Sequence, residues 1–321
     1  MSDRPTLLVT RTLPAPVESR LSADYDARLN SDDTQYDGDA LVARSVGADA
    51  ILTCSTERFS ADVIQQLPDS IRAIATYSVG HEHIDLDAAR ARNIIVTNTP
   101  DVLTDATADI ALLCLLGAAR RAKESIELMR SGKWSRWEAN TLLGVHLGGK
   151  NLGILGMGRI GQAVAKRARA FDMTIHYNNR TRLDPALENG ATFHENPEGL
   201  LAQSDFLSIN CPSTPGTRHF LDARRIELLP DGAVVVNTAR GDVVVDDALI
   251  DAVVRGKISG VGLDVYEGEP NFNPRYLTLN NAFLVPHIGS ATLDTRNAMG
   301  FRALANLDAV FSEEVPADQI T

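Results

Sequence analysis

Three glycines near the middle of the chain have the spacing of a phosphate-binding turn. Gly156, Gly158 and Gly161 form a G-x-G-x-x-G pattern inside the stretch "NLGILGMGRIGQAVAKRARAFDMTIHY". A strand-like run precedes the pattern, and an amphipathic helical run and a second strand-like run follow it. Glycines at these places permit a tight turn and let backbone amides approach a pyrophosphate closely. This order of elements favours a dinucleotide-binding site over an ordinary glycine-rich turn.

The stretch "TIHYNNRTRL", residues 174–183, lies where a dinucleotide site ordinarily carries an acid. A carboxylate about 20 residues beyond the glycines binds the free 2′-hydroxyl of the adenosine ribose. This chain has Asn179, Arg180 and Arg182 there instead. An arginine can pair with a 2′-phosphate, so we expect NADP(H) to be preferred, with Arg180 the main cause and Arg182 secondary. NAD(H) stays possible because Asn179 can hydrogen-bond a ribose hydroxyl, and solvated loop charges are the alternative role for both arginines.

Composition limits the classes of partner. The 321-residue chain is long enough for two domains of roughly 100 to 200 residues each. Its formal net charge of −11 argues against nucleic acid or an anionic membrane as partner, because both attract clustered lysine and arginine. Three widely spaced cysteines suggest neither a disulfide framework nor a zinc site, so no metal is expected and a cytoplasmic location fits best. The longest apolar stretch, "ATADIALLCLLGAA", is too short to span a membrane, and the N-terminus does not resemble a signal peptide.

Short β-branched runs alternate with helical runs along most of the chain. The first strands are expected at "TLLVT", "AILTC", "IRAIATY" and "IIVTN", with helices near 14–22, 39–46, 60–67 and 86–92. One long helix is expected from about 104 to 130, before a second series of strands at "NLGILG", "MTIHY", "DFLSIN", "AVVVNTA", "GVGLDV" and "AFLVP". A single helix is expected near the end of the chain. Such alternation predicts an α/β fold with parallel sheets covered on both faces.

Four stretches resemble one enzyme family, and the resemblance extends over essentially the whole chain. "GMGRIGQAVAKRARAF", "NTARGDVVVDDALIDA", "GVGLDVYEGEP" and "VPHIGSAT" are similar to the D-isomer-specific 2-hydroxyacid dehydrogenases, and within them to glyoxylate/hydroxypyruvate reductases. The resemblance implies two Rossmann-like/flavodoxin-like domains with parallel sheets flanking an active-site cleft. It also implies a substrate-binding (catalytic) domain of residues 1–99 and 288–321 around an NAD(P)-binding Rossmann domain of residues 100–287.

Three residues in these stretches have the side chains that reduction of a 2-keto acid requires. The reaction needs a hydride donor, a proton donor for the carbonyl oxygen and a cation for the carboxylate. Arg240 in "NTARGD" can bind a carboxylate through two N–H groups and polarise the adjacent carbonyl. His287 in "VPHIGS" and Glu269 in "YEGEP" are the expected proton donor and its partner, because a carboxylate favours the charged imidazole and fixes its orientation. The six other histidines, His219 among them, are interpreted as structural or exposed.

The resemblance also assigns residues to the substrate and to a second subunit. Val79, Gly80 and Ser290 are expected to contact the substrate carboxylate. A homodimer is expected, with the long helix buried in it and Trp137 reaching the partner's substrate site. The alternative for Trp134 and Trp137 is an ordinary anchoring role within one subunit.

Other residues are assigned to the cofactor by the same resemblance. Asp264 is expected near the nicotinamide, and a turn-forming role is its alternative. Cys211 and Pro212 in "INCPSTPGTRHF" are expected to line the adenine side, so the cysteine is interpreted as a wall and not as a nucleophile. The remaining expected cofactor contacts are Arg159, Ile160, Thr217, Thr238 and Gly289.

The expected function is reduction of glyoxylate or hydroxypyruvate to the D-2-hydroxy acid, with NADPH preferred. A D-lactate dehydrogenase and a phosphoglycerate-type dehydrogenase are alternatives, and Arg58 keeps a phosphate pocket possible. Formate dehydrogenases replace the glutamate of the pair, whereas this chain has Glu269. A nucleotide-sensing binding protein similar to a corepressor is the alternative outside enzymes.

Overall fold

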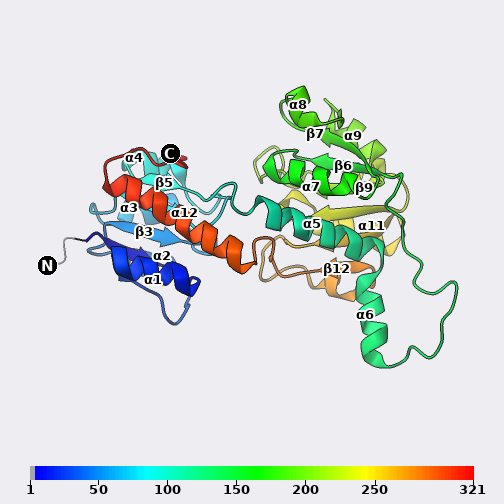
Figure 1. Cartoon of the computed structure of the whole chain (residues 1–321), viewed down its shortest axis with the longest axis horizontal. Helices are drawn as coiled ribbons and strands as arrows, with labels where there is room; N and C mark the ends of the chain where they lie inside the picture. The colour runs from blue at the N-terminus through cyan, green and yellow to red at the C-terminus, as the bar shows by residue number, and fades with distance from the viewer. Residues whose placement is uncertain (1–3) are drawn as a thin grey trace. The chain divides into compact units, whose positions relative to one another are not determined.

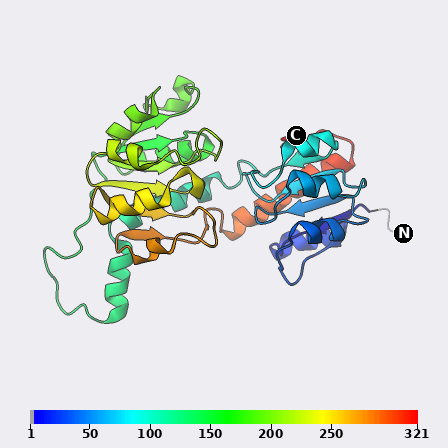
Figure 2. The ribbon, with the colours of Figure 1, turned by 180° about the vertical axis from the view of Figure 1, so that it is seen from behind.

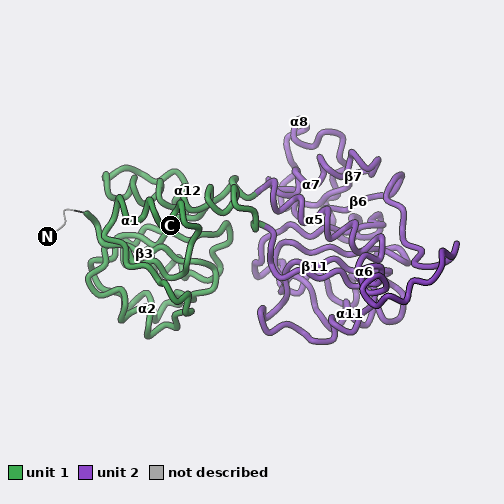
Figure 3. The backbone as a smooth tube through the Cα atoms, turned by 60° about the horizontal axis from the view of Figure 1, so that its bottom comes forward, with its two compact units in different colours: residues 1–103, 290–321 green, residues 104–289 purple. Residues whose placement is uncertain are grey.

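The computed structural model describes residues 4–321 as two compact units, each built on one parallel β-sheet (Figure 3). Unit 1 comprises the chain up to Leu103 together with Ser290–Thr321, and unit 2 comprises Thr104–Gly289. Helices lie on both faces of each sheet (Figures 1 and 2), which confirms the α/β fold expected from the sequence. Within residues 4–321, no helix combines the length and the apolar character needed to cross a bilayer.

The sheet of unit 1 has its five strands in the order β2-β1-β3-β4-β5, and every neighbouring pair is parallel. This is the order of flavodoxin-like folds, in which the strand sequence reverses beside the first strand. All residues of β3 and β4 are buried, as expected for central strands covered on both faces. The strands are β1 (Thr6–Val9), β2 (Asp26–Arg28), β3 (Ala50–Thr53), β4 (Ala73–Thr76) and β5 (Ile95–Thr97).

Five helices cover this sheet. Helices α2, α3 and α4 share one face, where their apolar side chains form one buried cluster with residues of the strands. Helices α1 and α12 pack against each other on the other face (Figures 1 and 2), so the C-terminal helix completes a unit that the N-terminal segment begins. The helices are α1 (Ala15–Asp24), α2 (Gly38–Arg44), α3 (Ala61–Gln66), α4 (Leu86–Ala91) and α12 (Leu293–Phe311).

The sheet of unit 2 has seven parallel strands in the order β12-β11-β10-β9-β6-β7-β8. The order reverses beside β6, because β7 lies on one side of it and β9 on the other. In open parallel sheets, ligands bind beyond the carboxyl ends of the strands at such a reversal. The strands are β6 (Asn151–Leu155), β7 (Thr174–Asn178), β8 (Thr192–Phe193), β9 (Phe206–Ile209), β10 (Ala233–Asn237), β11 (Ile258–Leu263) and β12 (Ala282–Leu284).

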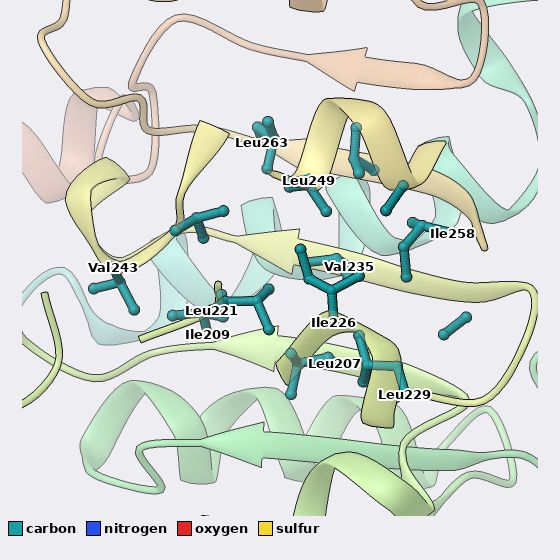
Figure 4. Packing of buried hydrophobic residues seen from close by; sticks show 14 of the residues in the cluster. Leu207, Ile209, Leu221, Ile226, Leu229, Val235, Val243, Leu249, Ile258 and Leu263 are labelled. Atoms are coloured by element: carbon teal, nitrogen blue, oxygen red, sulfur yellow. The ribbon is translucent and has the colours of Figure 1, made fainter. Parts of the chain in front are cut away.

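Two hydrophobic clusters sandwich the sheet of unit 2. Successive residues of β10 alternate between them: Val234 and Val236 face the cluster of α5 and α7, and Val235 faces the cluster of α9, α10 and α11 (Figure 4). Helix α5 lies directly on β11, since a Cβ at Gly262 would be 2.3 Å from the Cys114 carbonyl oxygen. The helices are α5 (Thr104–Ala119), α7 (Arg159–Arg169), α8 (Pro185–Glu188), α9 (Pro197–Gln203), α10 (Ala223–Leu228) and α11 (Asp246–Val254).

The expectation of one continuous helix from about 104 to 130 is wrong. Helix α5 ends at Ala119, Arg121 adopts a left-handed backbone with φ of 52°, and α6 (Ala122–Ser131) begins after it. No residue of α6 is buried, and Figure 1 shows it extending from the sheet together with the loop that follows. The apolar run stops at Ala119 and the charged sequence "RRAKESIELMRS" follows, so the second segment lacks an apolar face wide enough to continue on the sheet.

Candidate active site

The glycine turn lies between β6 and α7, at the point where the strand order of unit 2 reverses. Gly156 has a φ of 92°, and a Cβ there would be 2.6 Å from the Cys211 amide nitrogen. A Cβ at Gly161 would be 2.4 Å from the Gly156 carbonyl oxygen, so the helix packs closely on the turn. Gly158 is the N-cap of α7, has open space beside it and gives the helix no side-chain cap. The first amides of α7, at Arg159 and Ile160, are therefore placed to bind a phosphate.

Two buried polar atoms at neighbouring strand ends also fit a polar ligand. The Asn210 Oδ1 atom lies just after β9 and the Thr238 Oγ1 atom just after β10, and neither has a hydrogen-bond partner among residues 4–321. Buried polar atoms without partners are rare in folded proteins. Together with the uncapped helix and the glycine turn, they fit the pyrophosphate and polar groups of a nicotinamide dinucleotide.

The residue in the place of the customary acid is bonded to the glycine turn. Asn179 follows β7, and its Oδ1 accepts a hydrogen bond from the Met157 amide at 2.6 Å. The next residue, Arg180, is exposed and makes no hydrogen bond or ion pair among residues 4–321. A cation with no carboxylate partner therefore lies one residue from a side chain that contacts the glycine turn.

The loop after β9 is closed by its own side chains. The Thr217 hydroxyl donates a hydrogen bond to the Pro212 carbonyl at 2.6 Å and accepts one from the Thr214 amide at 2.8 Å. Cys211 is buried at the start of this loop, and burial raises the pKa of its thiol to about 12. The thiol therefore stays protonated at neutral pH, which makes it unsuited to act as a nucleophile.

His287 and Glu269 are in direct contact. The His287 Nδ1 atom lies 2.6 Å from the Glu269 Oε1 atom, and the Tyr266 amide donates a hydrogen bond to the other carboxylate oxygen at 3.2 Å. When the Nδ1–H group donates its hydrogen bond to the carboxylate, the Nε2 atom can exchange a proton with a ligand. An imidazole oriented in this way can act as a general acid and base.

Asp264 holds the backbone beyond His287. It lies just after β11 with 1% of its surface exposed, and its two oxygens accept hydrogen bonds from the Ile288 amide at 2.6 Å and the Gly289 amide at 2.8 Å. Burial raises the pKa of this carboxyl, while the two amide bonds and nearby His287 act in the opposite direction. The geometry makes Asp264 an anchor of this turn, and its contact with the nicotinamide ring stays a prediction.

Arg240 lies beyond β10, the strand next to β11. The Asn237 side chain fixes its segment, because the Nδ2 group donates to the Arg240 carbonyl at 2.8 Å and the Oδ1 atom accepts from the Ala239 amide at 3.0 Å. Gly241 lies against the backbone of the next loop, where a Cβ would be only 1.8 Å from the Tyr266 carbonyl carbon. Arg240, Glu269 and His287 thus follow three neighbouring strands, in loops that are bonded or packed together.

The expected substrate residues Val79, Gly80 and Ser290 belong to unit 1. The first two follow β4, where the Asn98 side chain donates a hydrogen bond to the Val79 carbonyl at 2.8 Å. The Arg296 Nε group donates to the Ser290 carbonyl at 3.3 Å. Trp137 belongs to unit 2, in the loop after α6, and 78% of its surface is exposed. Across residues 4–321, no group of three or more histidine, cysteine or acidic side chains is arranged to hold a metal.

Comparison with known proteins identifies the family. The NAD-binding domain of the D-isomer-specific 2-hydroxyacid dehydrogenases matches residues 112–289. The glycerate dehydrogenase of Hyphomicrobium methylovorum is 44% identical over 307 residues, which are 95% of each chain. The glyoxylate reductase of Thermococcus litoralis is 40% identical over 99% of this chain and 97% of its own. The chain belongs to the D-isomer-specific 2-hydroxyacid dehydrogenases.

Solved structures of this family agree over the whole length. A structure assigned to the D-isomer-specific 2-hydroxyacid dehydrogenases from a Polaromonas species has a TM-score of 0.94 and 45% identity, covering 99% of both chains. The NADPH-dependent glyoxylate/hydroxypyruvate reductase of Sinorhizobium meliloti, in complex with NADP and malonate, has a TM-score of 0.90 and 33% identity over 99% of this chain and 97% of its own. As a member of the family the chain is an oxidoreductase, and unit 2 contains its nicotinamide-cofactor-binding domain.

Reasoning from the sequence missed Glu188, a carboxylate that binds Arg182 in the loop after β7. Arg182 binds Glu188 through two contacts, Nε to Oε1 at 2.7 Å and Nη2 to Oε2 at 3.0 Å. The Tyr177 hydroxyl donates a third hydrogen bond to Oε1 at 2.6 Å. Hydrogen bonds from Arg182 and Tyr177 lower the pKa of Glu188 to about 2. Arg182 is therefore already paired, which leaves Arg180 as the open cation of the loop.

This pairing predicts a pH-dependent contribution to stability. Glu188→Gln should lower the melting temperature at pH 7, because a neutral amide cannot form the ion pair. A carboxyl whose folded pKa lies below its ordinary value of about 4.3 stabilises the fold above that value and loses this effect as the pH falls toward the folded pKa. The difference in melting temperature between parent and variant should thus be full at pH 6 to 7 and shrink below about pH 4.5.

Thermal unfolding followed by circular dichroism between pH 7 and about pH 3 measures this difference, because most of the loss falls below pH 4. Glu195→Gln is the matched control, since that exposed side chain makes no hydrogen bond or ion pair within residues 4–321 and should give no difference at any pH. A gap for Glu188→Gln that stayed constant across the range would contradict the assignment.

Proposed function

We propose that the protein reduces glyoxylate or hydroxypyruvate to the D-2-hydroxy acid and prefers NADPH. The observation that carries the proposal is the 2.6 Å contact between His287 Nδ1 and Glu269 Oε1, beyond β12 and β11, which continue the sheet from β10, the strand before Arg240. The names of the relatives, glycerate dehydrogenase and glyoxylate reductase, support this substrate class. D-lactate or phosphoglycerate-type activity is the alternative, and initial rates with glyoxylate, hydroxypyruvate, pyruvate and 3-phosphohydroxypyruvate distinguish them.

His287, Glu269 and Arg240 have separate roles in the proposed reaction. A bound nicotinamide supplies the hydride to the carbonyl carbon. His287 donates the Nε2 proton to the carbonyl oxygen during reduction and accepts it during oxidation, while Glu269 holds the ring through Nδ1. Arg240 binds the substrate carboxylate and polarises the carbonyl next to it. The keto acid thus gains one hydride and one proton.

We assign substrate binding to the domain of residues 1–99 and 288–321, and cofactor binding to that of residues 100–287. Val79 and Gly80 follow β4 of unit 1, and the carboxyl ends of parallel strands are where such sheets bind ligands. Their backbone amides and the Ser290 hydroxyl suit a carboxylate as hydrogen-bond acceptor.

The preference for NADPH is assigned to Arg180. Its guanidinium has no carboxylate partner among residues 4–321, whereas that of Arg182 is bound to Glu188. A 2′-phosphate would form a charged hydrogen-bond pair with Arg180 and meets no carboxylate at position 179. We assign Arg182 chiefly to the shape of the loop, so its secondary role in phosphate binding stays a prediction.

A homodimer is also proposed, with α6 and the loop after it as the contact surface. This surface exposes Ile126, Met129, Trp134, Trp137 and Leu143. A helix with no buried residue and several exposed apolar side chains is typical of an interface. In the dimer Trp137 would reach the partner's substrate site.

The first test concerns the proton donor. His287→Ala should lower kcat for glyoxylate reduction by roughly 100-fold or more, the usual contribution of general acid catalysis. Glu269→Gln should lower the rate and shift its pH profile, because the imidazole loses its charged partner. Steady-state kinetics on variants with unchanged melting temperatures measure both, and a folded His287→Ala with the parent rate would show the assignment to be wrong.

The second test concerns the cofactor. The parent should have a kcat/KM for NADPH that exceeds that for NADH by roughly 30-fold or more, the effect of one charged hydrogen-bond pair with a phosphate. Arg180→Ala should remove most of that ratio, while Arg224→Ala, which changes an exposed arginine of α10 bound to Glu198, should leave it unchanged. Equal or NADH-favouring values in the parent would contradict the preference, and an unchanged ratio in Arg180→Ala would exclude that residue as its cause.

The third test concerns the dimer. Light scattering at micromolar concentration should give twice the mass of one chain, and Met129→Glu together with Trp134→Glu should shift the mass toward one chain, because two charges would be buried in an apolar contact. Leu187→Glu is the matched control and should leave the mass unchanged, because this exposed apolar residue lies in α8, beyond β7 and far along the sheet from β12, the strand that α6 contacts. A parent mass equal to one chain would end the dimer proposal.

A further inference from the structure

A histidine without a role in the reaction joins two loops of unit 2. His219 lies near the end of the loop after β9, the loop that also contains Cys211, Pro212 and Thr217. Its Nε2 atom is 2.9 Å from Oε1 and 3.0 Å from Oε2 of Glu267. Glu267 is two residues before Glu269, so the contact ties the proposed adenine-side loop to the loop that orients His287.

The same loop is bonded to the segment of Arg240. The His219 amide donates a hydrogen bond to the Asp242 carbonyl at 2.7 Å, and the Ser213 hydroxyl donates to the Asp242 carboxylate at 2.7 Å. Gly241, between Arg240 and Asp242, lies against the backbone of Tyr266 and Glu267. Three loops, beyond β9, β10 and β11, therefore meet, and the imidazole of His219 bridges the first and the third.

His219 has a backbone conformation that favours glycine, so its side chain must be explained by another contact. Its φ of 51° lies in the left-handed region, which is unfavourable for residues other than glycine. Glycine would therefore suit the local backbone better than histidine. What the histidine adds is the contact of its ring with Glu267.

We propose that His219 and Glu267 are positioning residues that hold the turn of Glu269 in its working place. The inference rests on the proposed function, since it assigns no chemistry to the pair itself. The loop after β9 has other attachments: the bonds to Asp242, the pairing of Leu221 with Val244, and a longer contact of 3.5 Å between Arg218 Nη2 and Glu267 Oε1. Loss of the ring should thus act mainly on the turn of residues 264–270, and so on kcat more than on the KM for cofactor.

The ring borders a solvent-open hollow that makes the proposal testable by chemical rescue. The hollow has a volume of about 400 Å³ and is lined by His219, Asp246, Asp247, Glu267 and Phe272, with neighbouring residues of the 271–274 segment. Burial, together with the carboxylates of Glu267 and Asp247, raises the pKa of Asp246, while its bond from Tyr276 and nearby His219 act in the opposite direction. An acidic hollow of this size can admit free imidazole, whose charged form the carboxylates attract.

His219→Gly is the decisive variant, because glycine accepts the left-handed backbone and only the ring is lost. We expect kcat to fall by about 10-fold, the scale of a small displacement of a catalytic group, with the KM for NADPH within about 2-fold of the parent. Tens of millimolar imidazole should restore most of the rate, and His219→Gln, which keeps an N–H donor, should retain most of it. Asp247→Asn removes one charge from the same hollow without touching the link, so it is the matched control and should resemble the parent.

A second measurement needs neither cofactor nor turnover. Hydrogen–deuterium exchange of the cofactor-free protein should be faster at residues 264–270 in His219→Gly than in the parent or in Asp247→Asn. Glu267→Ala should give at least the exchange of His219→Gly, since it also removes the 3.5 Å contact with Arg218. The double variant should exchange no faster than Glu267→Ala, because without Glu267 the ring of His219 has lost the contact that is tested.

The outcomes separate the two proposals. A parent without reductase activity would contradict the proposed function, while the exchange experiment would still judge the link. An active parent with unchanged kcat and unchanged exchange in His219→Gly would overturn the positioning role. Additive losses in the double variant, or a loss of rate that imidazole does not restore, would overturn it as well.

Discussion

A buried carboxylate at the end of β11 holds the part of the molecule on which the proposed chemistry depends. Asp264 is nearly inaccessible to solvent, and the amides of Ile288 and Gly289 satisfy its oxygens. Those bonds offset part of the cost of burying the charge and fix the backbone immediately after His287. The same residue begins the turn that leads to Glu269. One side chain therefore sets where both members of the proposed proton-transfer pair begin.

Close backbone packing extends this order to Arg240. Gly241 has no space for a Cβ beside Tyr266, so the loops beyond β10 and β11 lie in direct contact. Parallel strands bring their carboxyl ends to one edge of a sheet, which places these loops together although they are distant in sequence. The link from His219 to Glu267 adds the loop beyond β9 to the same assembly. Residues with separate proposed roles thus share one rigid support.

The loop after β7, which we assign to the cofactor, has two side chains with partners in the described part of the protein and one without. The glycine turn is hydrogen-bonded to Asn179, and Arg182 is bound to Glu188. Arg180, between these two anchored residues, has no partner among residues 4–321. The anchored backbone of this loop needs little reordering when a phosphate binds, and the charge of Arg180 would supply the ion pair on which the proposed NADPH preference rests.

Local patterns in the sequence were sufficient for the α/β fold, the strands of both sheets other than β2 and β8, and the glycine turn. Hydrophobic alternation and glycine spacing act over a few residues, so they can be read without coordinates. The break at Arg121 was missed because the helical pattern continues through "RRAKESIELMRS". Only the lack of a wide apolar face shows that this second segment does not pack on the sheet. Both unpredicted strands are two or three residues long and contain no buried residue, so they have no hydrophobic alternation to detect.

Side-chain partners were decided by the tertiary structure alone. The pairing of Arg182 with Glu188 depends on a short helix turning the chain back after β7, and nothing in the spacing of the two residues reveals it. His219 had no visible context in the sequence because its partner Glu267 is 48 residues away and meets it only where strand ends converge. The sequence alone determined which chemical groups the protein has and which elements they follow. Their partners and their freedom to bind a ligand were decided by packing, because a hydrogen bond depends on distances of a few tenths of an ångström that no local pattern encodes.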